Sequence, residues 1–128
     1  MMINGLIEVI LYVEDMASQV AFYRDILGLQ VLYPAGLNDY GHEHWVTFKT
    51  GECILALHSG GRSRQADDEG SQRPVPKIVF GVGEILRARG HLLDRGVSLG
   101  EARLAAPGVW VCDGRDPEGN PFSIESFE

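Results

Sequence analysis

An acid near the end of the chain and a pair of histidines are the first residues whose types and spacing could do chemistry. Glu125 stands in "DPEGNPFSIES" (116–126), where a tight turn leads into a strand-like run. A carboxylate on a strand can bind a metal ion or act as a base, but it is as often a solvated residue. His42 and His44 have the H-x-H spacing that puts two rings on one face of a strand. Because a glycine-containing loop precedes them, we expect them to be exposed or at a cavity rim.

Other common chemistries find little support. Cys53 and Cys112 lie in apolar runs without an ordered histidine and carboxylate, and no G-x-S-x-G segment occurs. "SGGRS" (59–63) lacks the Gly-Lys-Ser/Thr of a phosphate-binding loop. With 18 acids against 11 bases and a net charge of −7, the chain is poorly suited to nucleic acid, because that binding depends on Lys and Arg contacts to phosphates. These observations favour a small-molecule site.

The sequence also predicts where the protein works. No apolar run approaches the roughly 20 residues of a membrane span. The start of the chain has no basic leader or cleavage site, and Glu8 interrupts its apolar run. The two cysteines have no C-x-x-C spacing and are typical of reduced, buried thiols. We therefore expect a cytoplasmic protein with no membrane or nucleic-acid partner.

Hydrophobic periodicity in the first half of the chain predicts a βαβββ order. Residues 6–13 alternate as in a strand, with Glu8 and Tyr12 on one face. A helix follows, with Asp15 as its N-cap and Gly28 just beyond its end. Further strands are expected at 29–33, 44–49 and 51–58.

The second half repeats this plan after a linker. Residues 59–76 have no apolar periodicity and are rich in Gly, Ser, Pro and charged residues. A helix closed by Gly96 is expected at 83–96, between strands at 77–82, 100–105, 108–113 and 121–127. The prediction is one α+β domain over 1–128, built from βαβββ modules at 4–58 and 77–128.

Three stretches of the chain resemble the vicinal oxygen chelate superfamily, which includes glyoxalase I, bleomycin-resistance proteins, fosfomycin-resistance enzymes and extradiol dioxygenases. They are "YVEDMASQVAFYRDILGLQV" (12–31), the strand–linker–strand middle, and "DGRDPEGNPFSIES" (113–126). The resemblance implies a cup-shaped mixed sheet with helices on its outer face and a ligand cavity enclosed by paired modules. It also implies a homodimer.

The resemblance assigns four positions to a metal ion. Metal-dependent members hold a divalent ion on His or Gln, Glu, His and Glu. Carried over by their offsets from Asp15 and from the DPEGN turn, these positions correspond to Glu8, Ala56, Lys77 and Ser123. Only Glu8 is an ordinary ligand, and the ammonium group of Lys77 would repel a divalent cation. The sequence therefore argues against the usual metal centre, and no cofactor is the favoured expectation.

Two other arrangements stay open. A register shifted by two residues would bring Glu8, His58 and Glu125 together as a triad for iron, manganese or zinc. Alternatively, Glu8 and Lys77 occupy equivalent positions of the modules and could face each other as an ion pair. In a catalytic version of this pair, Lys77 holds an anionic or carbonyl oxygen while Glu8 acts as a base.

The favoured function is a metal-independent small-molecule-binding protein, similar to the drug-sequestering members that resemble bleomycin-resistance proteins. The alternative is an enzyme of the same superfamily, a lyase, isomerase or dioxygenase, that uses the Glu8/His58/Glu125 triad or the Lys77/Glu8 pair. The acidic charge is compatible with a cationic ligand without requiring one. The ligand-binding surface is expected to include Tyr12, Trp45, His58, Trp110, Ser123 and Glu125.

Overall fold

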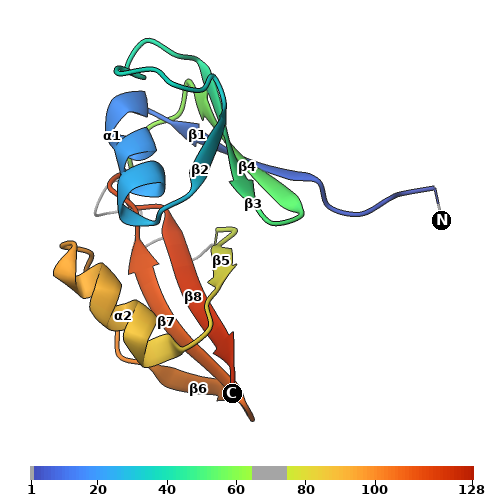
Figure 1. Ribbon diagram of the computed structural model, residues 1–128, viewed down its shortest axis with the longest axis vertical. Coiled ribbons are helices and arrows are strands. Elements are labelled where there is room, and N and C mark those ends of the chain that lie inside the picture. Colours follow the sequence, from blue (N-terminus) through green and yellow to red (C-terminus); the bar gives the residue numbers. More distant parts are fainter. Residues whose placement is uncertain (1, 65–74) are drawn as a thin grey trace. The chain divides into compact units, whose positions relative to one another are not determined.

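The protein consists of two compact units, Met1–Ser63 and Arg64–Glu128, here called module 1 and module 2. A computed structural model describes residues 2–64 and 75–128 of the chain. Each module has a four-stranded mixed sheet accompanied by a helix, in the order β-α-β-β-β (Figure 1). This confirms the predicted α+β fold class. Most of the predicted linker, residues 65–74, lies outside the described residues.

Module 1 contains β1 (Glu8–Val13), α1 (Met16–Ala21), the π-helix η1 (Phe22–Ile26), β2 (Gln30–Tyr33), β3 (Trp45–Thr50) and β4 (Cys53–Ser59). The strand order is β1-β4-β3-β2, with β1 parallel to β4 and the other pairs antiparallel. Strand β4 therefore extends one residue into the range predicted as linker.

The helix of module 1 begins as predicted but changes its winding. The Asp15 carboxylate accepts a hydrogen bond from the backbone N–H of Ser18 at 3.2 Å, as an N-cap does. From Phe22 onward the turn widens, because the N–H of Leu27 bonds to the carbonyl of Phe22, five residues back. Gly28 then has a φ of 79°, the left-handed conformation that ends a helix. The continuous α-helix predicted over this segment is thus wrong in its second half.

The two faces of the module 1 sheet differ in what covers them. One face carries the side chains of Val13, Val46, Phe48 and Leu57, all 0% exposed. Tyr23 of η1 packs against the Phe48 ring at 6.2 Å, so the helix covers this face. The opposite face, here called the open face of module 1, carries Glu8, Tyr12, Trp45 and His58, as strand alternation and register require.

Module 2 contains β5 (Ile78–Gly81), α2 (Ile85–Asp94), β6 (Arg103–Ala106), β7 (Val109–Arg115) and β8 (Pro121–Phe127), in the order β5-β8-β7-β6. The helix is shorter than predicted at both ends, and Gly96 follows it with a φ of 85°. Strand β6 begins later than predicted. The chain before it joins β7 separately, through an isolated bridge between Leu99 and Gly114.

Module 2 likewise has one covered face. Phe122, Ile124 and Cys112 are buried on the face that meets α2, whose own Ile85 and Leu92 are buried. Asp113, Ser123 and Glu125 alternate onto the other face, here called the open face of module 2.

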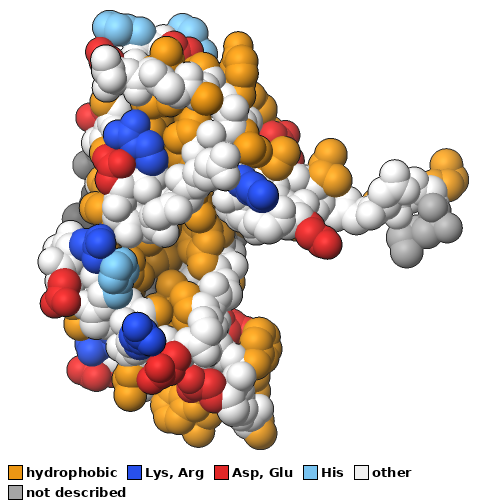
Figure 2. Space-filling model, viewed as in Figure 1, with side chains coloured by type: hydrophobic (Ala, Val, Ile, Leu, Met, Phe, Trp, Pro, Cys, Tyr) orange, Lys and Arg blue, Asp and Glu red, His pale blue; other side chains and the backbone are white. Residues whose placement is uncertain are grey.

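Residues 2–7 run as an extended segment before β1 (Figure 1). Their apolar side chains lie on the surface (Figure 2). Met2 is 98% exposed. No helix in the described part of the chain is long and apolar enough to cross a membrane.

The DPEGN segment forms a turn that is held by its first residue. Oδ1 of Asp116 accepts hydrogen bonds from the N–H groups of Glu118 and Asn120, both at 2.9 Å. Oδ2 accepts a third from the Asn120 side chain at 2.9 Å. Arg115 donates to the carbonyl of Gly119 at 2.7 Å, which adds a further hydrogen bond within the turn. The turn therefore fixes where β8 begins and which of its residues face each way.

Replacing Asp116 tests this turn. Asp116→Ala should lower the free energy of unfolding by about 2 kcal/mol, because buried backbone donors lose a charged acceptor. Asp116→Asn should cost less, since its amide oxygen can still accept both backbone bonds. Urea unfolding followed by circular dichroism measures both values. Equal stabilities for Asp116→Ala and the unmodified protein would contradict this account.

Candidate functional site

Three aromatic side chains lie next to one another on the open face of module 1. The register places His58 of β4 between Tyr12 of β1 and Trp45 of β3. The His58 ring centroid is 5.3 Å from that of Tyr12 and 5.8 Å from that of Trp45. Tyr12 is 60% exposed, whereas Trp45 and His58 are half-buried. We call Tyr12, Trp45 and His58 the aromatic cluster; it combines flat apolar surface with polar ring atoms on one face of the sheet.

The orientation of the His58 ring sets its hydrogen-bonding character. Its Nδ1 lies 2.6 Å from the carbonyl oxygen of Ser59. Because a carbonyl can only accept, Nδ1 carries the proton and Nε2 is the accepting nitrogen of the neutral ring.

The structure does not bring Glu8 and His58 together. Glu8 is paired with Ile54, and His58 is paired with Tyr12, four positions further along both strands. At the rise per residue of a β-strand, these four positions put Glu8 and His58 about 13 Å apart along the strand direction. The register of β1 on β4 thus removes the proximity that the Glu8/His58/Glu125 triad requires.

Asp113 of β7 organises the open face of module 2. One of its carboxylate oxygens accepts a hydrogen bond from the Ser123 hydroxyl at 2.5 Å. The same oxygen forms an ion pair with the ammonium group of Lys77 at 3.2 Å. The other accepts from Arg103 at 2.8 Å. Lys77 therefore has an anionic partner within its own module. A Glu8–Lys77 pair would join the two modules and stays a prediction.

The electrostatics of this network favour an ionised Asp113. Hydrogen bonds from Ser123 and Arg103 lower the pKa of Asp113 to about 2, against the opposing effect of partial burial. Lys77 lowers it further through its hydrogen bond and its charge. The carboxylate is a permanent anion at neutral pH, and it neutralises one of the two cations beside it.

The other predicted residues of module 2 divide between the faces. Ser123 is 0% exposed because it lies under Asp113, and Glu125 follows two residues later on the same open face. Trp110 pairs with Ser126 and alternates onto the opposite face, with Cys112 and Phe122. Trp110 thus does not share a surface with Ser123 and Glu125, contrary to the sequence-based expectation.

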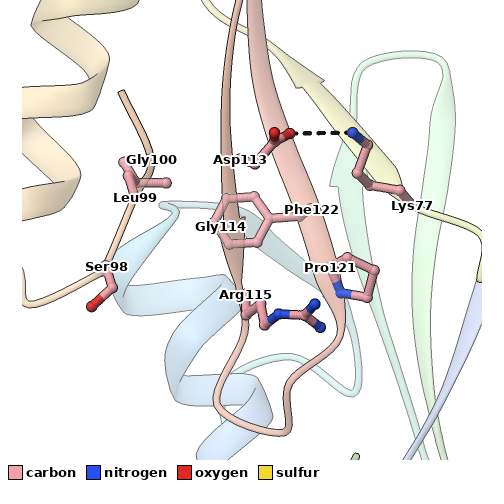
Figure 3. Close-up of a pocket in the computed structure, with 9 residues that line it drawn as sticks. All are labelled: Lys77, Ser98, Leu99, Gly100, Asp113, Gly114, Arg115, Pro121 and Phe122. Carbon is pink, nitrogen blue, oxygen red and sulfur yellow. Dashed lines mark hydrogen bonds and ion pairs between the residues drawn. The ribbon is translucent and has the colours of Figure 1, made fainter. Parts of the chain in front are cut away.

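A cleft of about 540 Å³ opens beside the Asp113 network. Lys77 and Asp113 line it together with the apolar side chains of Leu99, Pro121 and Phe122 (Figure 3). Figure 3 shows the carboxylate of Asp113 and the ammonium group of Lys77 pointing toward each other.

The positions that the resemblance assigns to metal ligands do not form a suitable donor set. The methyl group of Ala56 is 0% exposed, Lys77 is ion-paired with Asp113, and the Ser123 hydroxyl donates to the same carboxylate. Within residues 2–64 and 75–128, no three His, Cys, Asp or Glu side chains are grouped where they could hold a metal ion. His42 and His44 are both exposed, as predicted, and His44 bonds to Ser59.

The cysteines do not form a nucleophilic site. Cys112 is 0% exposed, and burial raises the pKa of its thiol. Cys53 is half-buried, so the expectation that both thiols are buried is wrong for this one.

Sequence reasoning missed Asp113 and Arg103. Asp113 ended a predicted strand that would neighbour the strand of Ser123, so pairing those two strands could have revealed the contact. Arg103 gave no local signal, because its position depends on the β6–β7 register, Arg103 opposite Val111, and on the irregularity that follows it.

The pKa of Asp113 predicts a pH effect on stability. A carboxyl whose folded pKa is below its usual value near 3.9 stabilises the fold above about pH 4, and this contribution is lost as the pH falls toward about 2. The effect should be small, because the Asp113 side chain is 46% exposed. Carbon-13 NMR of the Asp113 carboxyl should show a midpoint near 2. Between about pH 4 and pH 2, Asp113→Asn should lose less stability than the unmodified protein. The control is Asp94→Asn, which replaces an exposed acid of α2 and should lose as much as the unmodified protein. A midpoint near 4 would contradict the network.

Comparisons with known proteins agree with this architecture. Among solved structures, the fold is similar to a lactoylglutathione lyase from Agrobacterium tumefaciens, with 23% identity, a TM-score of 0.70, and coverage of 96% of this chain and 93% of that one. It is also similar to a putative glyoxalase family protein from Bacillus anthracis, at 18% identity, TM-score 0.74, and 98% and 97% coverage. TnmS3, an antibiotic binding protein from Streptomyces sp. CB03234, matches at 16% identity, TM-score 0.75, and 100% and 99% coverage. None of the curated proteins matches the sequence.

A family model matches residues 5–124, nearly the whole chain, and spans both modules. The duplicated βαβββ plan as far as the middle of β8, the helix capped by Asp15 and the DPEGN turn lie within the matched range. The chain therefore belongs to the Glyoxalase/Bleomycin resistance protein/Dioxygenase superfamily.

Proposed function

We propose that this protein binds a small organic molecule through the aromatic cluster of module 1, without the four-ligand metal site of its metal-dependent relatives. The observation that carries the proposal is the alignment of Tyr12, His58 and Trp45 across three adjacent strands of an open sheet face. Such a surface offers the apolar walls and few polar groups of a small-molecule site.

The hydrogen-bonding groups of the cluster indicate which chemical groups a ligand should carry. His58 presents an accepting Nε2, because its Nδ1 proton is used by the Ser59 carbonyl. A flat ligand with one hydrogen-bond donor would therefore match both the rings and this nitrogen. A cationic ligand would gain further from the aromatic faces and from the acidic charge of the chain.

Family membership and one structural neighbour support a binding role. TnmS3 is an antibiotic binding protein, so a fold of this kind is compatible with holding a drug-sized molecule. The remaining expectations, a homodimer in the cytoplasm and ligand contacts from Ser123 and Glu125, are proposed with it.

Truncating the tryptophan of the aromatic cluster tests the binding surface. A thermal-shift screen of flat aromatic compounds that carry a hydrogen-bond donor should find compounds that raise the melting temperature. Trp45→Ala should weaken their affinity about tenfold in calorimetric titrations, since losing a buried aromatic contact costs at least about 1.4 kcal/mol. Trp110→Ala is the matched control, because Trp110 lies on the helix-covered face of its sheet. Equal affinity in Trp45→Ala and the unmodified protein would contradict the proposal.

Metal analysis separates binding from the enzymatic alternative, a lyase, isomerase or dioxygenase. Protein purified without chelator should contain far less than one transition metal per chain, and ligand affinity should not change on adding nickel, zinc, iron or manganese. This follows because the four assigned positions provide one ordinary ligand, Glu8. About one tightly held metal per chain, lost in Glu8→Gln but kept in the exposed control Glu52→Gln, would instead establish a metalloprotein.

A further inference from the structure

The side chains of Lys77 and Arg103 converge on Asp113 at the open face of module 2. Their nitrogens lie 3.2 Å and 2.8 Å from the two carboxylate oxygens. We propose that Lys77 and Arg103 form a binding site for the carboxylate of an organic acid. Its residues all belong to module 2, whereas the aromatic cluster belongs to module 1, so the proposal goes beyond the function proposed above and does not depend on it.

The local charge favours an anion of charge −1. In the Asp113 network two fixed cations share one carboxylate, which leaves about one positive charge there in a chain whose net charge is −7. A monoanion would neutralise that excess. A phosphate dianion would be repelled more strongly by Asp113, because like charges at short range oppose each other.

Both cations keep donors for a ligand. Arg103 uses one terminal guanidinium nitrogen for Asp113, and an arginine has five N–H donors. Lys77 uses one of its three donors in the same way. Their side chains are 54% and 39% exposed, so solvent reaches them. A carboxylate can take two parallel bonds from a guanidinium group and a third from an ammonium group.

Asp113 acts as a positioning residue in this site. The buried hydroxyl of Ser123 holds its carboxylate at 2.5 Å, and both carboxylate oxygens are engaged. Because Asp113 is fixed by a buried partner, it holds the two long cationic side chains near one point. Less conformational entropy is then lost when the ligand binds.

The adjoining cleft indicates the rest of the ligand. Next to Lys77 and Asp113 it has an apolar wall at Pro121, which alternates onto the same face of β8 as Ser123 (Figure 3). An acid that carries an apolar group would place its carboxylate on the cations and that group against this wall. Benzoate is the simplest probe with both features, and benzamide is its neutral analogue of the same shape.

A purely structural role predicts a different outcome. The four network residues connect all four strands of module 2: Lys77 precedes β5, Arg103 begins β6, Asp113 lies on β7 and Ser123 on β8. If the network only joins strands, replacing a cation should lower stability without changing the response to an anion. The test must therefore measure binding and stability separately.

The experiment is a titration of the full chain with benzoate, followed by proton–nitrogen NMR at constant ionic strength. We expect saturable shifts at the amides of Asp113 and Gly114 and at the Arg103 side chain, and much smaller shifts with benzamide. Arg103→Gln and Lys77→Met should each weaken benzoate binding about tenfold, the cost of losing a charge-assisted hydrogen bond. Arg87→Gln, which removes the same charge from an exposed position of α2, should leave the affinity unchanged.

Three results would overturn the site. They are equal responses to benzoate and benzamide, benzoate affinity unchanged in folded Arg103→Gln, or inorganic phosphate binding more tightly than benzoate. If Arg103→Gln does not fold, Arg103→Lys keeps the charge but loses the planar fork, and should bind benzoate more weakly than the unmodified protein. The aromatic cluster is unchanged in all these variants, so a negative result here leaves the Trp45→Ala test unaffected.

Discussion

The parallel pairing of the first and last strands within each module decides which side chains lie next to one another on each face of the sheet. In module 1, β1 lies on β4 with Glu8 opposite Ile54 and Tyr12 opposite His58. In module 2, β5 lies on β8 with Val79 opposite Ser123. A shift of one residue in either register would move the side chains that a strand buries to the solvent-facing side of the sheet. The buried faces prevent such a shift, since Val13, Phe48 and Phe122 are 0% exposed and would have to move into water.

This register gathers aromatic side chains in module 1 and charged side chains in module 2, a division that the sequence alone does not show. On the open face of module 1 it gathers aromatic rings, and it keeps the one suitable carboxylate, Glu8, four positions away from His58. On the open face of module 2 it gathers charges, with a serine beneath them. The first surface suits flat apolar groups and the second suits an ionic contact. Neither resembles the ring of carboxylate and imidazole ligands that a divalent metal needs.

The fold was accessible to sequence reasoning because its signals are local and occur twice. Alternation located the strands, the Asp15 cap and the closing glycines marked the helices, and the repetition of this order indicated the family. The π-helix was not accessible, because no residue type in 22–26 favours that winding over an α-helix. The start of β6 was misplaced for a similar reason. It depends on the Leu99–Gly114 bridge, which is a long-range contact.

The candidate site was only partly predictable, and the reason is physical. Alternation correctly put Tyr12 on the face of Glu8, and the same rule puts Glu125 on that of Ser123. The neighbours of these residues, however, come from other strands, and register is a tertiary property. Trp110 was assigned to the wrong face because the composition of its own strand could not show which face α2 covers. Asp113 was overlooked because it becomes important only when Lys77, Arg103 and Ser123 converge on it.

The burial of Ser123 under Asp113 also constrains the evolutionary routes open to this chain. A change of Ser123 to glutamate would place a carboxylate at the position that the family resemblance assigns to a metal ligand. It would also force a second carboxylate into a fully buried place against Asp113, where two like charges raise each other's energy. That step becomes tolerable only after Asp113 has changed, and changing Asp113 first leaves Lys77 and Arg103 without their shared counter-charge. The two positions therefore depend on each other, because neither substitution alone leaves the charges of this network balanced.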